Sequence, residues 1–174
     1  MVDLKTERNS DGFYTIDIEK TGKDGTTIVN AVISTASRLT YFTCEDVAKM
    51  LRKKPETVYK FIRDHKSVIV DRMMCTPCYM DNVKLNGKSI ERLYFIIHSG
   101  QSTQSCIGLD IFANAEVKTK HTWMELDYVN EAYYRSDFMK NFGELEPYDI
   151  ENTIGDDRTM KSIDVLFDRA SGNR

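Results

Sequence analysis

Residues 43 to 64 read Thr-Cys-Glu-Asp-Val-Ala-Lys-Met-Leu-Arg-Lys-Lys-Pro-Glu-Thr-Val-Tyr-Lys-Phe-Ile-Arg-Asp, and this stretch predicts two short helices joined by a tight basic turn. Thr43 is a suitable N-cap for the first helix, and Asp46, three residues later, takes the place of the Glu in a capping box. Pro55 disfavours helical geometry at Lys54 and suits the first turn of a new helix. We therefore expect two separate helices.

Two apolar faces support this prediction. They consist of Val47, Ala48 and Leu51 in the first helix and of Val58, Phe61 and Ile62 in the second. The small Ala48 lies where two such helices must approach closely, and Val58 lies where the second helix packs back on the first. This spacing resembles the helix-turn-helix of excisionases and MerR-type regulators, over about 22 of the 174 residues.

The turn departs from that family's pattern at Arg52, where a glycine able to adopt a positive φ is usual. Because arginine adopts this conformation only at some energetic cost, we expect a remodelled turn. The residues also leave open a second interpretation, in which the pair is an ordinary helical hairpin packed on a sheet.

A β-hairpin is predicted downstream of the helices. Residues 83–97 hold two apolar segments on either side of Asn86-Gly87, a pair that tolerates the positive φ values of a type I′ turn. At this point in the chain a hairpin has the position of the wing in winged-helix proteins, where basic side chains would reach DNA phosphates. The basic residues on or near its tip are Lys84, Lys88 and Arg92.

Charge is distributed unevenly along the chain. The formal net charge of −3 argues against a protein that coats nucleic acid non-specifically. Between Lys49 and Arg72, however, eight basic residues stand against three acidic ones, and from Met124 to Arg174 twelve acidic residues stand against six basic ones. A basic patch on an acidic chain is typical of a site-specific DNA binder, although a solvated face has the same appearance.

These observations predict a sequence-specific DNA-binding regulator that reads duplex DNA with the helix at 55–64 and a wing near 83–97. The residues expected at the DNA are Lys53, Lys54, Thr57, Lys60, Arg63, Lys84, Lys88 and Arg92. Through Asp46-Val47-Ala48 and Leu93-Tyr94-Phe95 the chain also resembles the Rha and Bro-N groups, which implies transcription regulation in a phage or mobile element. The alternative is a protein-interaction module, a phage inhibitor that binds a host protein through an acidic surface and uses the helix-turn-helix as a scaffold.

The flanking segments complete the expected fold class, which is α+β: a winged helix-turn-helix with β-hairpin flanks and a C-terminal helical segment. The expected flanking elements are a hairpin at 13–18 and 27–33, strands at 67–74 and 106–112, a helix at 121–142, a short helix at 162–167 and a frayed end at 1–11. We divide the chain into a DNA-binding region at 1–114 and an acidic helical segment at 115–174, packed on the same domain.

The segment from Trp123 to Phe138 carries five aromatic side chains. Such a stripe predicts packing against the sheet or against a dimer partner, with base stacking as the alternative. Regulators usually present two copies of a helix-turn-helix at spaced half-sites, so we expect a homodimer. Its predicted interface is residues 123–142, where Tyr133 and Phe138 add apolar surface.

Cys75-Thr-Pro-Cys78 suggests the main alternatives to DNA binding, a redox site or a zinc site, because C-x-x-C pairs occur in redox sites and as half of zinc sites. The other candidate ligands show no second close pair; they are Cys44, Cys106, His65, His98 and His121. We therefore predict two free thiols in a proline turn that joins two strands, with no metal and no cofactor, while zinc and a redox switch stay open as alternatives.

The chain lacks the motifs of common enzyme classes, such as G-x-x-x-x-G-K-[ST], H-E-x-x-H and G-x-S-x-G. Neighbouring residues on a strand point to opposite faces, so His98 and Ser99 would not meet as base and nucleophile. We therefore predict that the protein is not an enzyme. Without an apolar run of membrane-spanning length or a signal-peptide core, we expect it in the cytoplasm, with no membrane partner.

Overall fold

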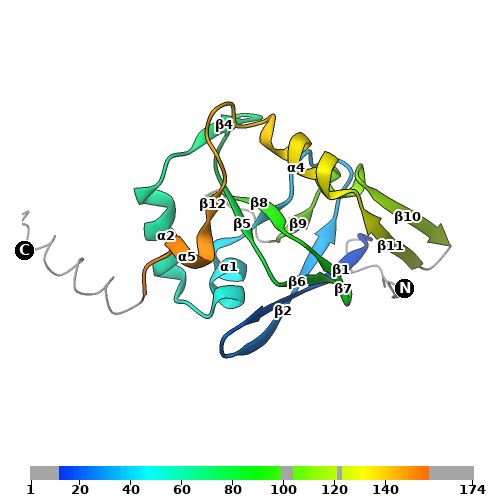
Figure 1. The fold of residues 1–174 in the computed structure, drawn as a ribbon, viewed down its shortest axis with the longest axis horizontal. Coiled ribbons are helices and arrows are strands. Elements are labelled where there is room, and N and C mark those ends of the chain that lie inside the picture. Colours follow the sequence, from blue (N-terminus) through cyan, green and yellow to red (C-terminus); the bar gives the residue numbers. More distant parts are fainter. Residues whose placement is uncertain (1–11, 99–103, 121–122, 157–174) are drawn as a thin grey trace, which may run out of the picture.

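The computed structural model describes residues 12–98, 104–120 and 123–156, which fold around a curled, mixed β-sheet (Figure 1). Within these ranges the main sheet contains β1 (Thr15–Gly22), β2 (Gly25–Ile33), β3 (Tyr41–Phe42), β4 (Val68–Val70), β5 (Met73–Met80), β6 (Val83–Leu85), β7 (Lys88–Ile90), β8 (Leu93–His98), β9 (Cys106–Ile107) and β12 (Tyr148–Asp149). A separate two-stranded sheet consists of β10 (Ala115–Lys120) and β11 (Trp123–Val129). The helices are α1 (Cys44–Leu51), α2 (Pro55–Asp64), α3 (Leu109–Phe112), α4 (Glu131–Met139) and α5 (Ile150–Thr153), and in this part of the chain no helix is long and apolar enough to span a membrane.

Strands that are neighbours in the main sheet are often far apart in the sequence. Their order is β12-β5-β8-β3-β9-β2-β1-β6-β7, with β4 paired to β5. β2 pairs in parallel with β9, and β3 pairs in parallel with β8. The short β3 therefore brings the loop that precedes it, residues 34–40, to the centre of the sheet.

The predicted N-terminal hairpin is confirmed in β1 and β2. Ile16 and Ile18 are fully buried and alternate with more exposed residues, so one face of β1 lies in the core. Gly22 pairs with Gly25, which leaves a two-residue turn between the strands.

The predicted hairpin at Asn86-Gly87 also forms, with φ values of 48° and 83° at the turn. It is not a wing, however. β6 pairs with β1, where Leu85 lies opposite Ile18, so the hairpin extends the sheet and does not stand beside α2 (Figure 1).

The two helices predicted from residues 43–64 form with their expected signals. Thr43 Oγ1 accepts a hydrogen bond from Asp46 N at 3.1 Å, and Pro55 begins α2. Arg52 ends α1 with φ 55° in the left-handed region, a conformation that costs a residue with a Cβ about 1 kcal/mol.

The surroundings of these helices overturn the predicted fold class and the resemblance on which it rested. α1 contacts β1 and β2 as well as α2, so the buried faces of Val47, Ala48 and Val58 belong to the core of a large sheet. The α+β winged helix-turn-helix is therefore wrong, and so is the resemblance to excisionases, MerR-type, Rha and Bro-N regulators. The protein is a mainly β fold in which a helical hairpin packs on the sheet.

The helix predicted at 121–142 is wrong in its first half. Residues 123–129 are β11, which pairs with β10, and α4 begins only at Glu131 after the N-cap Asn130. The strand predicted at 106–112 is likewise split into β9 and α3. The predictions for residues 1–11 and 162–167 lie outside the described residues.

α4 closes the core above β8. Tyr134 donates its hydroxyl to Tyr94 O at 2.9 Å and accepts from Tyr94 N at 2.6 Å, while Phe138 and Phe142 are buried beside them. Within the described side chains of the predicted dimer interface, residues 124–142, Tyr128 and Tyr133 are exposed, at 56% and 65%. Leu126, Phe138 and Phe142, which motivated the homodimer prediction, are therefore buried within this chain.

Candidate functional site

A groove of about 340 Å³ lies between the loop at residues 34–40 and the β4–β5 hairpin. We call the loop the floor of the groove and the hairpin its roof. Tyr41 of β3 and Ile96 of β8 complete the lining. The groove is thus built from three segments that are distant in the sequence, residues 34–41, residues 70–75 and Ile96.

The floor is fixed in place by α3. Leu109 N donates a hydrogen bond to Ser37 O at 2.8 Å, and Gly108 N donates to Thr40 Oγ1 at 3.1 Å. Gly108 permits this approach, because a Cβ there would lie 2.5 Å from Leu39 O and 2.8 Å from Ser37 O. A glycine is therefore required by the close packing of two backbones.

Asp110 ties the end of the floor to the same helix. Its carboxylate accepts hydrogen bonds from Thr40 N at 3.0 Å and from Thr40 Oγ1 at 2.7 Å, while Thr40 O accepts from Ile96 N at 3.0 Å. Burial of this carboxyl group raises its pKa to about 6, although the hydrogen bonds from Thr40 and Ile111 act in the opposite direction. The floor is thus bonded to both α3 and β8.

The roof is a tight hairpin with two different faces. Asp71 and Arg72 have φ values of 49° and 67°, as a two-residue type I′ turn requires. Val70 pairs with Met73 across this turn. The side chains of Val70, Met73 and Cys75 lie on the same face of the hairpin, the inner face, and line the groove.

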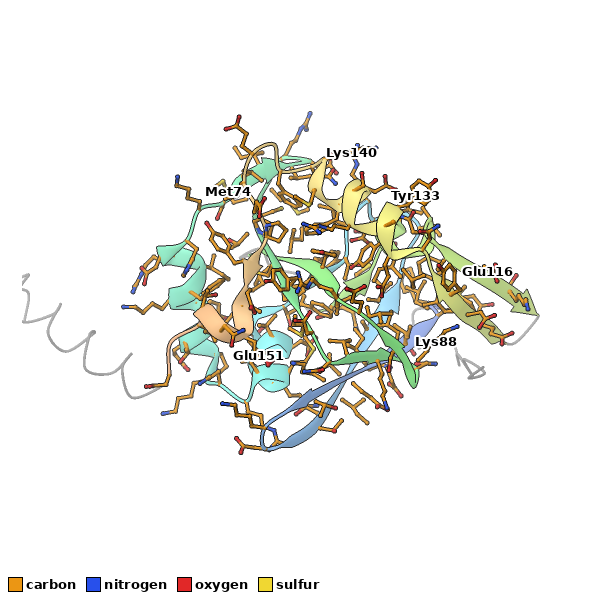
Figure 2. All side chains as sticks on the ribbon, viewed as in Figure 1. Met74, Lys88, Glu116, Tyr133, Lys140 and Glu151 are labelled. Carbon is orange, nitrogen blue, oxygen red and sulfur yellow. The ribbon has the colours of Figure 1, made fainter. Side chains whose placement is uncertain are left out.

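The outer face of the roof is apolar and exposed. Ile69 and Met74, which pair with each other, are 70% and 56% exposed. In Figure 2 Met74 lies at the periphery of the molecule, on the strand that follows the turn. The hairpin therefore covers the groove without being covered itself.

The polar groups of the groove lie at its mouth and in the floor. Arg38 Nε is 4.0 Å from Asp71 Oδ2, an exposed ion pair that joins floor and roof and contributes little to stability. Ser34 Oγ accepts from Ala36 N at 3.2 Å, and Ser37 Oγ donates to a carbonyl of its own loop at 2.7 Å. Among the described residues that line the groove, Asp71 carries the single carboxyl group.

The structure does not place the residues predicted to bind DNA in this groove. On α2, Thr57 is buried at 3% exposure, and Lys60 and Arg63 lie 3.7 Å and 3.5 Å from the Asp64 carboxylate. Lys53 precedes α2 in the turn, and Lys54 is the N-cap residue.

The basic residues of the predicted wing lie elsewhere. Lys88 Nζ forms an ion pair with Asp127 at 2.6 Å, and Arg92 Nε one with Asp81 at 3.0 Å, with its guanidinium over the ring of Tyr79. Lys84 is exposed on β6. Lys88 and α2 lie on opposite sides of the molecule in Figure 2, so the eight predicted residues do not form one face.

Cys75 and Cys78 lie within β5, where Pro77 pairs with Ile96, so the predicted proline turn is wrong. Both thiols are buried, and burial raises the pKa of each. Within the described ranges, no three His, Cys, Asp or Glu side chains gather where they could hold a metal ion.

Sequence reasoning missed the groove. The sequence prediction assigns no element and no role to residues 34–39, and it places Asp71-Arg72 inside a strand from Ser67 to Met74. One available signal was Gly108, directly after a buried strand and two residues before a buried acid, because such a glycine marks a close backbone approach.

Comparison with known proteins identifies the architecture. No protein-family model matches the chain, and no curated protein sequence matches it. Among solved structures, the chain is similar to the crystal structure of a retropepsin-like aspartic protease from Rickettsia conorii, with a TM-score of 0.52 and 16% sequence identity. The match covers 72% of this chain and 90% of that one. At this identity the likeness shows the fold alone.

This likeness overturns the functional predictions made from residues 43–64. A DNA-binding transcription regulator with duplex DNA as its partner is wrong, because the chain shares the fold of the retropepsin-like structure, in which a large mixed sheet and not a helix-turn-helix forms the core. The alternative, a host-protein inhibitor built on a helix-turn-helix scaffold, is wrong for the same reason. The exclusion of an enzyme is also wrong, since it rested on missing motifs of other folds.

Proposed function

We propose that this chain binds an extended polypeptide segment in the groove between the 34–40 loop and the β4–β5 hairpin. The observation that carries the proposal is the groove itself, an open space of about 340 Å³ with a fixed floor and an apolar inner roof. The similarity to a retropepsin-like aspartic protease supports it, because a protease must accommodate a polypeptide chain.

The backbone of the roof suits an extended ligand. In a two-residue hairpin the residues that flank the turn exchange both backbone hydrogen bonds, so the peptide groups of Ile69 point away from β5. Among the described strands β4 pairs with β5 alone, which leaves this edge open for an added strand. Val70 and Met73 on the inner face would contact apolar side chains of the ligand.

Cleavage of the bound chain would need more than this lining supplies. The aspartic protease mechanism uses two carboxyl groups that share one proton. The described lining has the carboxyl group of Asp71, which lies 4.0 Å from the Arg38 guanidinium. A second carboxyl group would have to come from elsewhere, for example from a second copy of the chain, so the proposal concerns binding and the experiment also measures cleavage.

The test uses peptides selected from a random displayed library on the immobilised chain. A selected peptide is synthesised in two forms. The form with a fluorophore alone reports binding through its fluorescence anisotropy. The form with a fluorophore and a quencher at its two ends reports cleavage through the rise in fluorescence. We expect saturable binding, and hydrolysis in this assay would add peptidase activity to the same groove.

Two neighbouring methionines provide the control. Met73→Lys places a charge on the face that lines the groove and should weaken binding about tenfold or more, because the bound ligand would remove that charge from water. Met74→Lys places the same charge on the exposed outer face and should leave the affinity within about twofold. Equal loss in both variants, or failure to select any peptide, would overturn the proposal.

A further inference from the structure

A second cavity lies where the β1–β2 turn, the turn between α1 and α2, and α5 meet. Its volume is about 300 Å³, at the lower end of the range for small-molecule sites. The cations that line it are Lys20, Lys23, Arg52 and Lys53, and the acids are Asp24 and Glu151. Figure 2 shows Glu151 on α5, beside the α1 ribbon.

One of these cations is already neutralised. Lys20 is 1% exposed, forms an ion pair with Glu151 and donates to Asp81 O at 2.7 Å and Thr21 O at 3.2 Å. Its three donors are therefore occupied, and Glu151 has a partner. This ion pair is electrically neutral, so the net charge of the cavity lining depends on the other four charged residues, Lys23, Asp24, Arg52 and Lys53.

The remaining charges are positive in excess and unpaired. Lys23, Arg52 and Lys53 face one carboxylate, Asp24, and none of the four side chains makes an ion pair or hydrogen bond to another residue in the described part of the chain. Unpaired cations around a concave surface attract an anion, because the low-dielectric walls concentrate their field.

Arg52 is held toward this cavity at an energetic cost. It has φ 55°, where glycine would be more favourable. A Cβ on Gly25 would lie 2.9 Å from Arg52 Nη2, so the guanidinium rests directly against the β1–β2 turn. A strained backbone that presents a guanidinium beside a cavity is a reason to look for a ligand of that guanidinium.

Apolar side chains also line the cavity. Met50 and Ile154 are buried and Leu51 is half-buried, and all three contribute to the lining. The site therefore suits a molecule with a compact anionic group at one end and an apolar group at the other.

We propose that this cavity binds a phosphate monoester, with the phosphoryl group on Arg52, Lys53 and Lys23 and the organic group against Met50 and Ile154. A guanidinium can donate two parallel hydrogen bonds to phosphate oxygens, and the two ammonium groups supply further charge-assisted donors.

The experiment is isothermal titration calorimetry of the full chain at low ionic strength, with phenyl phosphate and inorganic phosphate as probes. We expect phenyl phosphate to bind about tenfold tighter than inorganic phosphate, because its ring covers the apolar part of the cavity. A peptide containing phosphotyrosine forms a second arm: tighter binding than phenyl phosphate would assign the ester to a modified protein, and weaker binding to a free small molecule. The absence of binding at millimolar phenyl phosphate would overturn the proposal.

Arg52→Gly separates binding from folding. It removes the guanidinium and also relieves the strained φ, so the midpoint of urea unfolding should stay the same or rise while the affinity for phenyl phosphate falls about tenfold or more. Lys53→Gln, at a position without strain, should weaken binding as well and serves as the test if Arg52→Gly unfolds early. Arg63→Ala, an exposed arginine of α2 outside the cavity, is the matched control and should bind as the wild type does. Unchanged affinity in both cavity variants would overturn the proposal.

Discussion

Replacement of Gly108 by alanine should destabilise the protein by about 3 to 5 kcal/mol. The added Cβ would lie 2.5 Å from Leu39 O and 2.8 Å from Ser37 O, well inside the 3.4 Å at which ordinary contact begins. Both neighbours are backbone atoms, so no side chain can rotate away and the 34–40 loop itself must move. Such overpacking costs about 1 to 3 kcal/mol. The displaced loop also weakens the hydrogen bonds from Leu109 N and Gly108 N, at about 1 kcal/mol each.

The assay is equilibrium urea unfolding followed by circular dichroism, in which the midpoint should fall while the slope stays the same. Gly22→Ala is the matched control, because a Cβ at Gly22 meets no atom within 4 Å. Its free energy of unfolding should stay within about 0.5 kcal/mol of the wild type. A loss of less than about 1 kcal/mol in Gly108→Ala would show that the loop shifts easily, and that α3 does not fix the floor of the groove.

Three further predictions follow from buried groups. Burial raises the pKa of Asp110 to about 6, so between pH 4.5 and pH 7 the folded state holds a proton that the unfolded state releases. The free energy of unfolding of the wild type should therefore fall by about 2 kcal/mol over this range relative to that of Asp110→Asn. Parallel pH profiles of the two proteins would contradict this prediction. Tyr134→Phe leaves the backbone N–H and C=O of Tyr94 unpaired and should cost about 2 to 4 kcal/mol in thermal unfolding, whereas Tyr133→Phe, at an exposed position, should change nothing. All four cysteines are buried with raised pKa values, so an aromatic disulfide reagent at pH 8 should titrate them only after denaturant is added, and rapid labelling of the native protein would count against the burial.

Local signals in the sequence predicted local structure well. The helices at 43–64 and the turns at Gly22–Gly25 and Asn86-Gly87 depend on residues close together in the chain, such as Thr43 as a cap and Pro55 as a first-turn residue. The surroundings of the helices depend on contacts that no local pattern encodes. Tyr41 pairs with Ile96 and Cys106, and a two-residue strand of this kind has no sequence signature of its own.

The error at residues 123–129 has a different cause. Trp123, Leu126 and Val129 recur every three residues, which fits a helix as well as it fits chance in a short strand. In the structure Met124, Glu125 and Leu126 are buried in succession, so both faces of β11 are covered and neither helical nor alternating periodicity applies. A strand covered on both faces gives no pattern from which its type can be assigned.

The groove could not be predicted from the sequence, because its lining residues are of ordinary types and form a groove only through their positions in the fold. Arg38 and Asp71 are separated by more than thirty residues, and nothing in either neighbourhood signals that they meet at one mouth. The basic residues at 53–63, from which we predicted DNA binding, are clustered in the sequence, yet two of them, Lys60 and Arg63, form ion pairs with Asp64. Charge density along a chain is thus a poor guide to what its surface gathers in space.

The two sides of the groove should differ in their rates of amide hydrogen exchange. The Thr40 and Ile96 amides are bonded to α3 and to the sheet centre, so they should exchange only when the whole chain unfolds. β4 has three residues and pairs with β5 alone, so the amides of Val68 and Val70 should exchange through a local opening of far lower free energy. A bound chain would then slow exchange in the hairpin and leave the loop unaffected, and the lifetime of the complex would be set by how often the hairpin lifts.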